Sequence, residues 1–252
     1  MTINDSAEGT GITGPAYWGF WGTVLWGTLV AFVFIVLQTI MIIAILLARG
    51  TPHSSSLFVH SLAAAATDGY ILSVVTFATT IICTSLVTVI IKLKKNSVLQ
   101  EYLCLRPVPL IIMLKWVAVL AVFIALANAI SLAMGRPIVS DFMTAIYATA
   151  NPVWLLWLAL IFVAPLFEEV FFRGFLFQGF ASGFLGTTGT VFVTSGLWAV
   201  IHTQYDTYDK VVIFCLGLVL GTARVHTRSL LAPYGLHALT NLEATLEAAW
   251  LG

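Results

Sequence analysis

Long uninterrupted runs of hydrophobic residues, separated by short polar stretches, dominate this chain. They lie at 18–47, 70–91, 110–134, 152–180, 188–203, 211–225 and 230–250. Apolar runs of about 18 residues or more are typical of transmembrane helices. We therefore predict an all-α, polytopic membrane helix bundle with about seven transmembrane helices, eight also being allowed.

The same pattern predicts how the chain is organised. A polar N-terminal tail covers residues 1–17, N-terminal transmembrane helices cover 18–135, and a second helical core covers 150–252. We expect these parts to form one integral membrane domain.

Composition agrees with a membrane protein and narrows the function. Hydrophobic residues make up 60% of the chain and charged residues 9%, and the mean hydropathy is +1.02. The formal net charge is zero, so no nucleic-acid partner is expected. The three cysteines follow no metal-binding or disulfide spacing. In the sixth run, Gly217 and Gly221 form a GxxxG pattern that predicts close helix packing.

Basic residues gather after the second and sixth hydrophobic runs. These two loops lie on one side of the membrane if seven helices alternate in direction. Because positive loops tend to stay in the cytoplasm, we predict a cytoplasmic N-terminus. The residues concerned are Lys92, Lys94, Lys95, Arg106, Arg224 and Arg228.

Three charged residues, Glu168, Glu169 and Arg173, lie in the middle of the fourth run. Ionisable side chains inside a membrane helix are costly and by default mark function. Residues four apart share a helix face, so Glu169 and Arg173 should form an ion pair. Glu168 points about 100° away, so we expect it to act as a general base while the pair supports it. Pro165, just ahead, should free a backbone carbonyl.

Two later runs bring histidines to a matching depth. At ~1.5 Å per residue, Glu168 and His202 lie ~18 and ~21 Å from one membrane face, and Asn241 lies ~16 Å deep. His237 is four residues before Asn241 and shares its helix face. These four side chains can therefore meet at one buried point.

Such a group suits the hydrolysis of a peptide bond. Glu168 and His202 would remove a proton from water, and His237 and Asn241 would donate hydrogen bonds to the oxyanion. The same residue types also allow a divalent metal such as zinc, held by Glu168, His202 and His237. No HExxH pattern supports that alternative.

Simpler interpretations exist for each residue taken alone. The Glu169 and Arg173 pair could only lock helices together, and a single intramembrane histidine is often a packing group. Glu243 and Glu247 share a face near the C-terminal end, where we expect them to face solvent.

Three motifs resemble those of the CPBP family, which includes the type II CAAX prenyl endopeptidases and the bacterial Abi proteins. Residues 168–173 (EEVFFR) are similar to its EExxxR motif, 198–202 (WAVIH) to its FxxxH motif and 237–241 (HALTN) to its HxxxN motif. Trp198 stands where Phe is usual, and we expect it to change only the shape of the substrate cavity.

The resemblance implies an all-helical intramembrane protease with a catalytic cavity inside the bundle. In the family, the first Glu and the second-motif His are taken to activate water, and the third-motif His and Asn to form the oxyanion hole. Those roles carry over to Glu168, His202, His237 and Asn241. Family members are often named metalloproteases.

We therefore expect an intramembrane endopeptidase in a bacterial plasma membrane. Its partners would be membrane lipid and a peptide or protein substrate, lipidated or membrane-anchored. A non-catalytic bacteriocin-immunity or scaffold protein of the same family is the alternative. A proton-coupled transporter is a third hypothesis, which the lack of visible internal repeats disfavours.

Overall fold

The computed structural model describes residues 16–50 and 55–251. Helices and the turns that join them make up these residues, and none of them forms a β-strand. The predicted all-α fold is therefore confirmed. The polar tail predicted at 1–17 lies almost entirely outside the described residues.

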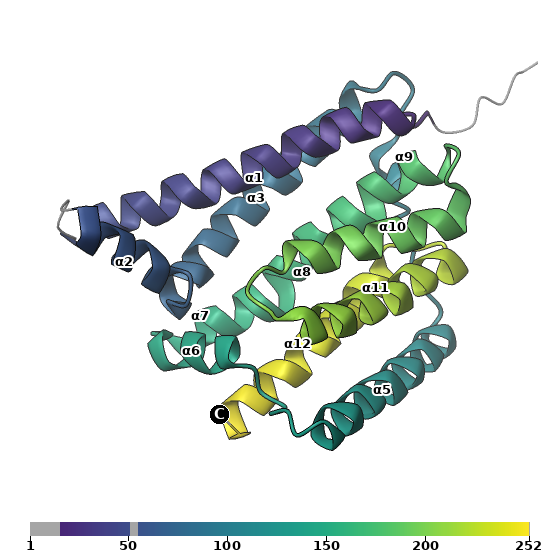
Figure 1. Ribbon diagram of the computed structural model, residues 1–252. Helices are drawn as coiled ribbons and strands as arrows, with labels where there is room; N and C mark the ends of the chain where they lie inside the picture. The colour runs from purple at the N-terminus through teal and green to yellow at the C-terminus, as the bar shows by residue number, and fades with distance from the viewer. Residues whose placement is uncertain (1–15, 51–54, 252) are drawn as a thin grey trace, which may run out of the picture.

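Two long antiparallel helices form one side of the bundle (Figure 1). α1 (Phe20–Ala48) packs along α3 (Gly69–Leu93), and the short α2 (Ser55–Ala65) joins them. Asp68 caps α3 and pairs with Arg49 at 2.7 Å. The hydrophobic pattern predicted α1 and α3 but missed α2, because an 11-residue helix is too short to give a membrane-spanning run.

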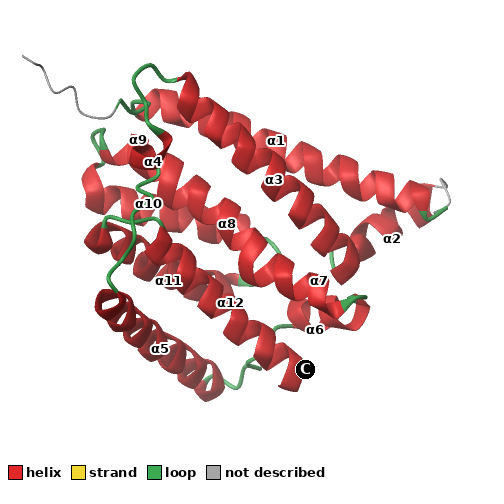
Figure 2. Ribbon diagram, turned by 180° about the vertical axis from the view of Figure 1, so that it is seen from behind, coloured by secondary structure: helices red, strands yellow, loops and turns green. Residues whose placement is uncertain are grey.

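Another long helix stands at the opposite edge of the bundle (Figures 1 and 2). α5 (Leu110–Ala133) contacts α11 and α12, and Leu120 is its one buried residue. The short helices α4 (Leu99–Tyr102) and α6 (Asp141–Thr149) lie before and after it in the chain. Most of α5 is therefore left on the surface of the bundle.

A helix through the middle of the bundle runs from residue 153 to 181 and contains two π-helical segments. These segments are η1 (Ala159–Val163) and η2 (Glu169–Leu176), and all eight residues of η2 are buried. π-Helical turns are rare and are frequently found at functional sites. The other segments are α7 (Val153–Leu158), α8 (Ala164–Glu168) and α9 (Phe177–Ala181).

Three further helices complete the bundle, α10 (Gly186–Ile201), α11 (Thr207–Thr227) and α12 (Leu231–Leu251). α10 and α11 pack so closely that a Cβ on Gly217 would lie 2.8 Å from the Cβ of Ser195. A Cβ on Gly221 would similarly lie 2.9 Å from a methyl group of α10. The close packing predicted from the GxxxG pattern is therefore confirmed.

Among the described residues, five helices are long and apolar enough to cross a membrane. The chain is thus an integral membrane protein. α10 has only 16 residues and α12 contains several polar ones, and neither is among the five. The predicted number of seven transmembrane helices is therefore not confirmed, although each predicted run coincides with a helix. The five are Phe20–Ala48, Gly69–Leu93, Leu110–Ala133, Val153–Ala181 and Thr207–Thr227.

The two basic loops lie at the same end of the bundle. The hydroxyl of Ser229 donates to the carbonyl of Arg106, and the N–H of Leu230 donates to the carbonyl of Cys104 at 3.0 Å. The start of α1 lies there too, because the Trp18 indole donates to the Ile90 carbonyl at 3.0 Å. This end of the bundle, which we call the basic end, therefore carries the positive charges that the sequence placed on one side.

Replacing Gly217 with Ala should destabilise the α10 and α11 pair. Overpacking costs about 1–3 kcal/mol, and the better helix propensity of Ala returns about 0.5–1 kcal/mol. We expect a net loss of about 1–2 kcal/mol, measured as a lower Tm in detergent. Gly196→Ala is the matched control, because its Cβ would meet nothing closer than a Phe214 carbon at 4.0 Å. Equal melting of the two variants would contradict the packing argument.

Candidate active site

A buried network of three charged or polar side chains lies at the centre of the bundle. Arg173 Nη1 donates to Glu169 Oε1 at 2.9 Å, with side-chain exposures of 0% and 1%. The predicted ion pair is therefore confirmed. His237 Nδ1 lies 2.9 Å from the same oxygen, and a carboxylate only accepts, so the histidine donates. Glu169 thus contacts a predicted catalytic residue directly, which the sequence did not reveal.

Glu168 lies beside this network with a different environment. Its side chain is 21% exposed, and its Oε2 accepts a hydrogen bond from Trp198 Nε1 at 2.5 Å. The same oxygen lies 3.9 Å from His237 Nε2, too far for a direct hydrogen bond. Within the described residues Arg173 forms an ion pair with Glu169 alone. This agrees with the expectation that Arg173 neutralises Glu169 and not Glu168.

Trp198 lies at the centre of the motif residues and is only 2% exposed. The Arg173 guanidinium carbon lies 4.4 Å from the centroid of its ring. The rings of His202 and His237 each approach it edge-on, with centroids 5.1 Å away. The expectation that Trp198 only changes the cavity shape therefore overlooks its hydrogen bond to Glu168, which a Phe could not make.

His202 is held at the end of α10 by one ring nitrogen, and the other has no hydrogen bond to the described residues. It follows the last helical residue, and its Nδ1 lies 2.6 Å from the carbonyl oxygen of Trp198. Because a carbonyl only accepts, Nδ1 carries a proton, and in the neutral ring Nε2 then has a free lone pair. The ring stacks on Tyr205 at 6.2 Å. Glu168 and His202 meet through Trp198, with no direct hydrogen bond between them in the described part of the chain.

Asn241 has a backbone partner in the π-helical segment. Its Nδ2 donates to the Leu160 carbonyl at 2.8 Å. In η1 the Ala164 N–H bonds the carbonyl five residues earlier, and the next residue, Pro165, has no N–H to continue that series. The Leu160 carbonyl is therefore freed by the proline, as the sequence predicted for a backbone carbonyl here, and Asn241 satisfies it.

The predicted metal ligands do not form a metal centre. No group of three His, Cys, Asp or Glu side chains in 16–50 and 55–251 could hold a metal ion. Glu168, His202 and His237 each contact Trp198, and the contact of His202 with the other two runs through that side chain. The geometry therefore does not support the metalloprotease interpretation.

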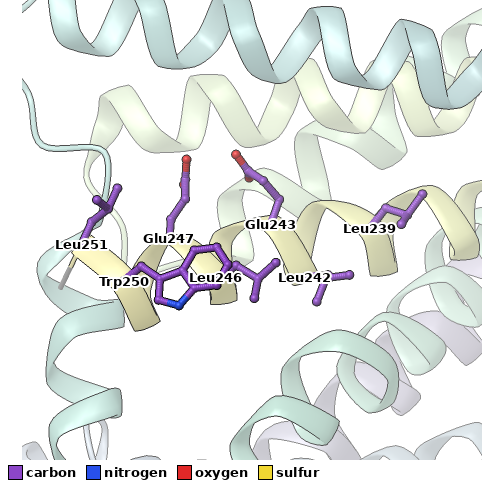
Figure 3. A pocket seen from close by; sticks show the side chains of 7 residues that line it. All are labelled: Leu239, Leu242, Glu243, Leu246, Glu247, Trp250 and Leu251. Carbon is purple, nitrogen blue, oxygen red and sulfur yellow. The ribbon is translucent and has the colours of Figure 1, made fainter.

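A second pair of carboxylates lies farther along α12 (Figure 3). Glu243 and Glu247 are half-buried and accept hydrogen bonds from Asn128 of α5, at 3.4 and 3.0 Å. They line a cavity of about 400 Å³ with Leu246 and Trp250. The expectation that they face solvent is therefore wrong, because α5 packs beside them. None of the four predicted catalytic residues lines this cavity.

Comparison with known proteins supports the family resemblance that the three motifs indicate in the C-terminal part of the chain. Residues 149–242 match the sequence model of the family described as type II CAAX prenyl endopeptidase Rce1-like. An Escherichia coli protein described as an uncharacterized 24.3 kDa protein is 36% identical over 108 residues, which cover 41% of this chain and 48% of that protein. The match thus spans about half the length of that relative. No solved structure matches the chain.

The two glutamates should differ in their effect on stability. Glu169→Gln leaves Arg173 as a buried, unpaired charge, which costs about 3–5 kcal/mol. Glu168→Gln keeps an acceptor for the Trp198 N–H and sits in a partly exposed position, so we expect a loss below about 1 kcal/mol. Thermal melts of both variants in the same detergent measure the difference. Equal Tm values would contradict the assignment of Arg173 to Glu169.

Proposed function

Since residues 149–242 match the sequence model of the type II CAAX prenyl endopeptidase family, we propose that this membrane protein is an intramembrane endopeptidase that uses Glu168 and His202 to activate water. The observation that carries this assignment is the environment of Glu168. It is the partly exposed carboxylate beside a buried ion pair, and Trp198 and His237 surround its Oε2.

Water activation needs proton acceptors that are not already neutralised. The Glu168 carboxylate accepts one hydrogen bond, from Trp198, and keeps further lone pairs. His202 keeps a free lone pair on Nε2, because its Nδ1 proton is committed to a carbonyl. In our proposal, water bound to these groups loses a proton to Glu168, and the hydroxide adds to the carbonyl carbon of the scissile peptide bond.

The negative charge then forms on the carbonyl oxygen of the substrate. In our proposal His237 acts as an imidazolium, with its Nδ1–H donating to Glu169 Oε1 at 2.9 Å and its Nε2–H donating to the substrate oxygen. Asn241 has a second N–H besides the one on the Leu160 carbonyl, and that N–H is the second donor we propose. Collapse of the intermediate breaks the C–N bond, and the proton passes from Glu168 to the leaving amine.

The substrate class and the orientation follow from the membrane setting. We propose a peptide or protein substrate that is lipidated or membrane-anchored, because the catalytic groups lie inside a helix bundle. The basic end, with the start of α1, would face the cytoplasm of a bacterial cell under the positive-inside rule. A divalent metal remains a proposal from the residue types alone, and loss of activity in a chelator, restored by zinc, is its test.

Comparison of membrane proteomes tests the proposed activity. Membranes from cells that express the wild type should contain new peptide termini that are absent with Glu168→Gln. The melting experiment above establishes that this variant is folded. Identical termini in both samples would favour the alternative, a non-catalytic immunity or scaffold protein in which the Glu169 and Arg173 pair only joins helices.

Glu168 and His202 should behave as one catalytic unit. Residues that act together in one step give non-additive losses. We therefore expect the double variant Glu168→Ala/His202→Ala to be no slower than the slower of the two single variants. The measurement is the cleavage rate of one substrate from the proteomic comparison in detergent. Losses that multiply would instead assign the two residues to separate steps.

Trp198→Phe should slow the reaction without unfolding the protein. It keeps an aromatic ring over Arg173 but removes the N–H that holds Glu168. A hydrogen bond to a charged group contributes about 1.5–3 kcal/mol, so we expect kcat to fall about 10- to 100-fold. The KM should change little if Trp198 positions the base. A raised KM with unchanged kcat would instead make Trp198 a substrate-binding residue.

A further inference from the structure

A cavity of about 580 Å³ opens at the basic end of the bundle, and none of the residues that line it belongs to the three motifs. Three arginines line it, Arg106, Arg224 and Arg228, and they come from the loop before α5 and from the end of α11. Glu101 is the one carboxylate on its wall. The wall therefore carries a net positive charge, and its ligand should be an anion.

Arg224 gives this cavity a preorganised donor. The residue is 3% exposed, and its Nε donates to the Arg173 carbonyl at 3.1 Å. Its guanidinium carbon lies 5.3 Å from the centroid of the Phe177 ring. With Nε and the ring fixing its orientation, Nη2 is buried and has no hydrogen-bond partner among the described residues. A buried guanidinium without a full set of acceptors is costly, and an anion in the cavity would supply them.

The other two arginines are exposed and free to close on a ligand. No ion pair joins Arg106 or Arg228 to a carboxylate in the described part of the chain. Gln178 and Thr187 add neutral hydrogen-bond donors to the same wall. Several guanidinium groups that converge with neutral donors are the arrangement that recognises a phosphate group.

The position of the cavity favours a phosphate that belongs to a lipid. At the same end, Trp21 and Phe184 both contact Phe20 at the start of α1, and each is 77% exposed. Exposed Trp side chains mark the headgroup level of a bilayer. Basic pockets between transmembrane helices bind anionic headgroups, and Lys92 and Lys95 would attract such lipids to this end.

We propose that this cavity binds the phosphodiester of an anionic phospholipid, with Arg224 as the buried donor and Arg106 and Arg228 as the exposed ones. The site is separate from the proposed water-activating residues. Binding is therefore measurable whether or not the chain cleaves peptides, and the two proposals can fail independently.

Thermal unfolding of the purified full chain in detergent tests the proposal, with phosphatidylglycerol added in one arm and phosphatidylcholine in the other. A ligand of the folded state raises Tm. We expect phosphatidylglycerol to raise the Tm of the wild type by about 3 °C or more over phosphatidylcholine. Arg106→Gln/Arg228→Gln should lose at least half of this rise. Lys92→Gln/Lys95→Gln is the matched control, since it removes the same charge at the same end, outside the cavity.

Native mass spectrometry of the same samples gives a second readout that does not depend on melting. The wild type and the lysine variant should retain one phosphatidylglycerol that the arginine variant releases. Equal retention and equal Tm shifts in both variants would overturn the site, because attraction would then be general. A third arm uses inorganic phosphate. An arginine-dependent rise with phosphate but none with phosphatidylglycerol would overturn the lipid as the source of the phosphate.

Discussion

The buried ion pair between Glu169 and Arg173 is the interaction on which the remaining structure depends. An isolated charge in the interior of a membrane bundle is very costly, so neither side chain could occupy its position without the other. The pair also fixes its neighbours. Glu169 accepts from His237 of α12, the Trp198 ring of α10 lies against Arg173, and Arg224 of α11 donates to the Arg173 carbonyl. One charge pair thus connects four helices.

This network explains how two adjacent glutamates can do different work. Glu169 is committed to Arg173 and His237, so its charge is balanced inside the protein. Glu168 points to a partly exposed position and is held by the Trp198 N–H. Trp198 therefore connects the structural pair to the proposed base, because its ring face contacts the cation while its ring edge binds the carboxylate. A single side chain thus couples stability to the geometry of the site.

The π-helical segments give the site its shape. The residue added to each turn shifts the faces that 153–181 presents, and η2 begins at Glu169, directly after Glu168. In η1 the register leaves the Leu160 carbonyl without an N–H partner, because Pro165 has none to give. Asn241 reaches that carbonyl from α12 and so ties its own helix to the broken one. The irregularity in η1 is therefore a point at which α12 is tied to the central helix.

The sequence by itself determined the class of the protein and most of its helices. Long apolar runs fix helices in a membrane because every backbone group must be satisfied within its own segment. The spacing of four residues predicted the Glu169 and Arg173 pair, and the GxxxG pattern predicted close helix packing at Gly217. Each of these predictions rests on residues spaced within a few turns of one helix, and such spacings can be seen directly in the sequence.

Only the tertiary structure decided which long-range partners the motif residues take. Three hydrogen bonds of the motif residues join positions at least 30 residues apart. They link Trp198 to Glu168, His237 to Glu169, and Asn241 to the carbonyl of Leu160. The side-chain direction that makes them depends on helix rotation, and the π-helical register changed that rotation from the α-helical value assumed along the sequence. The arginine cavity likewise exists because α11 ends beside the loop that precedes α5. These two segments are far apart in the sequence, so no residue spacing could have predicted that they lie side by side.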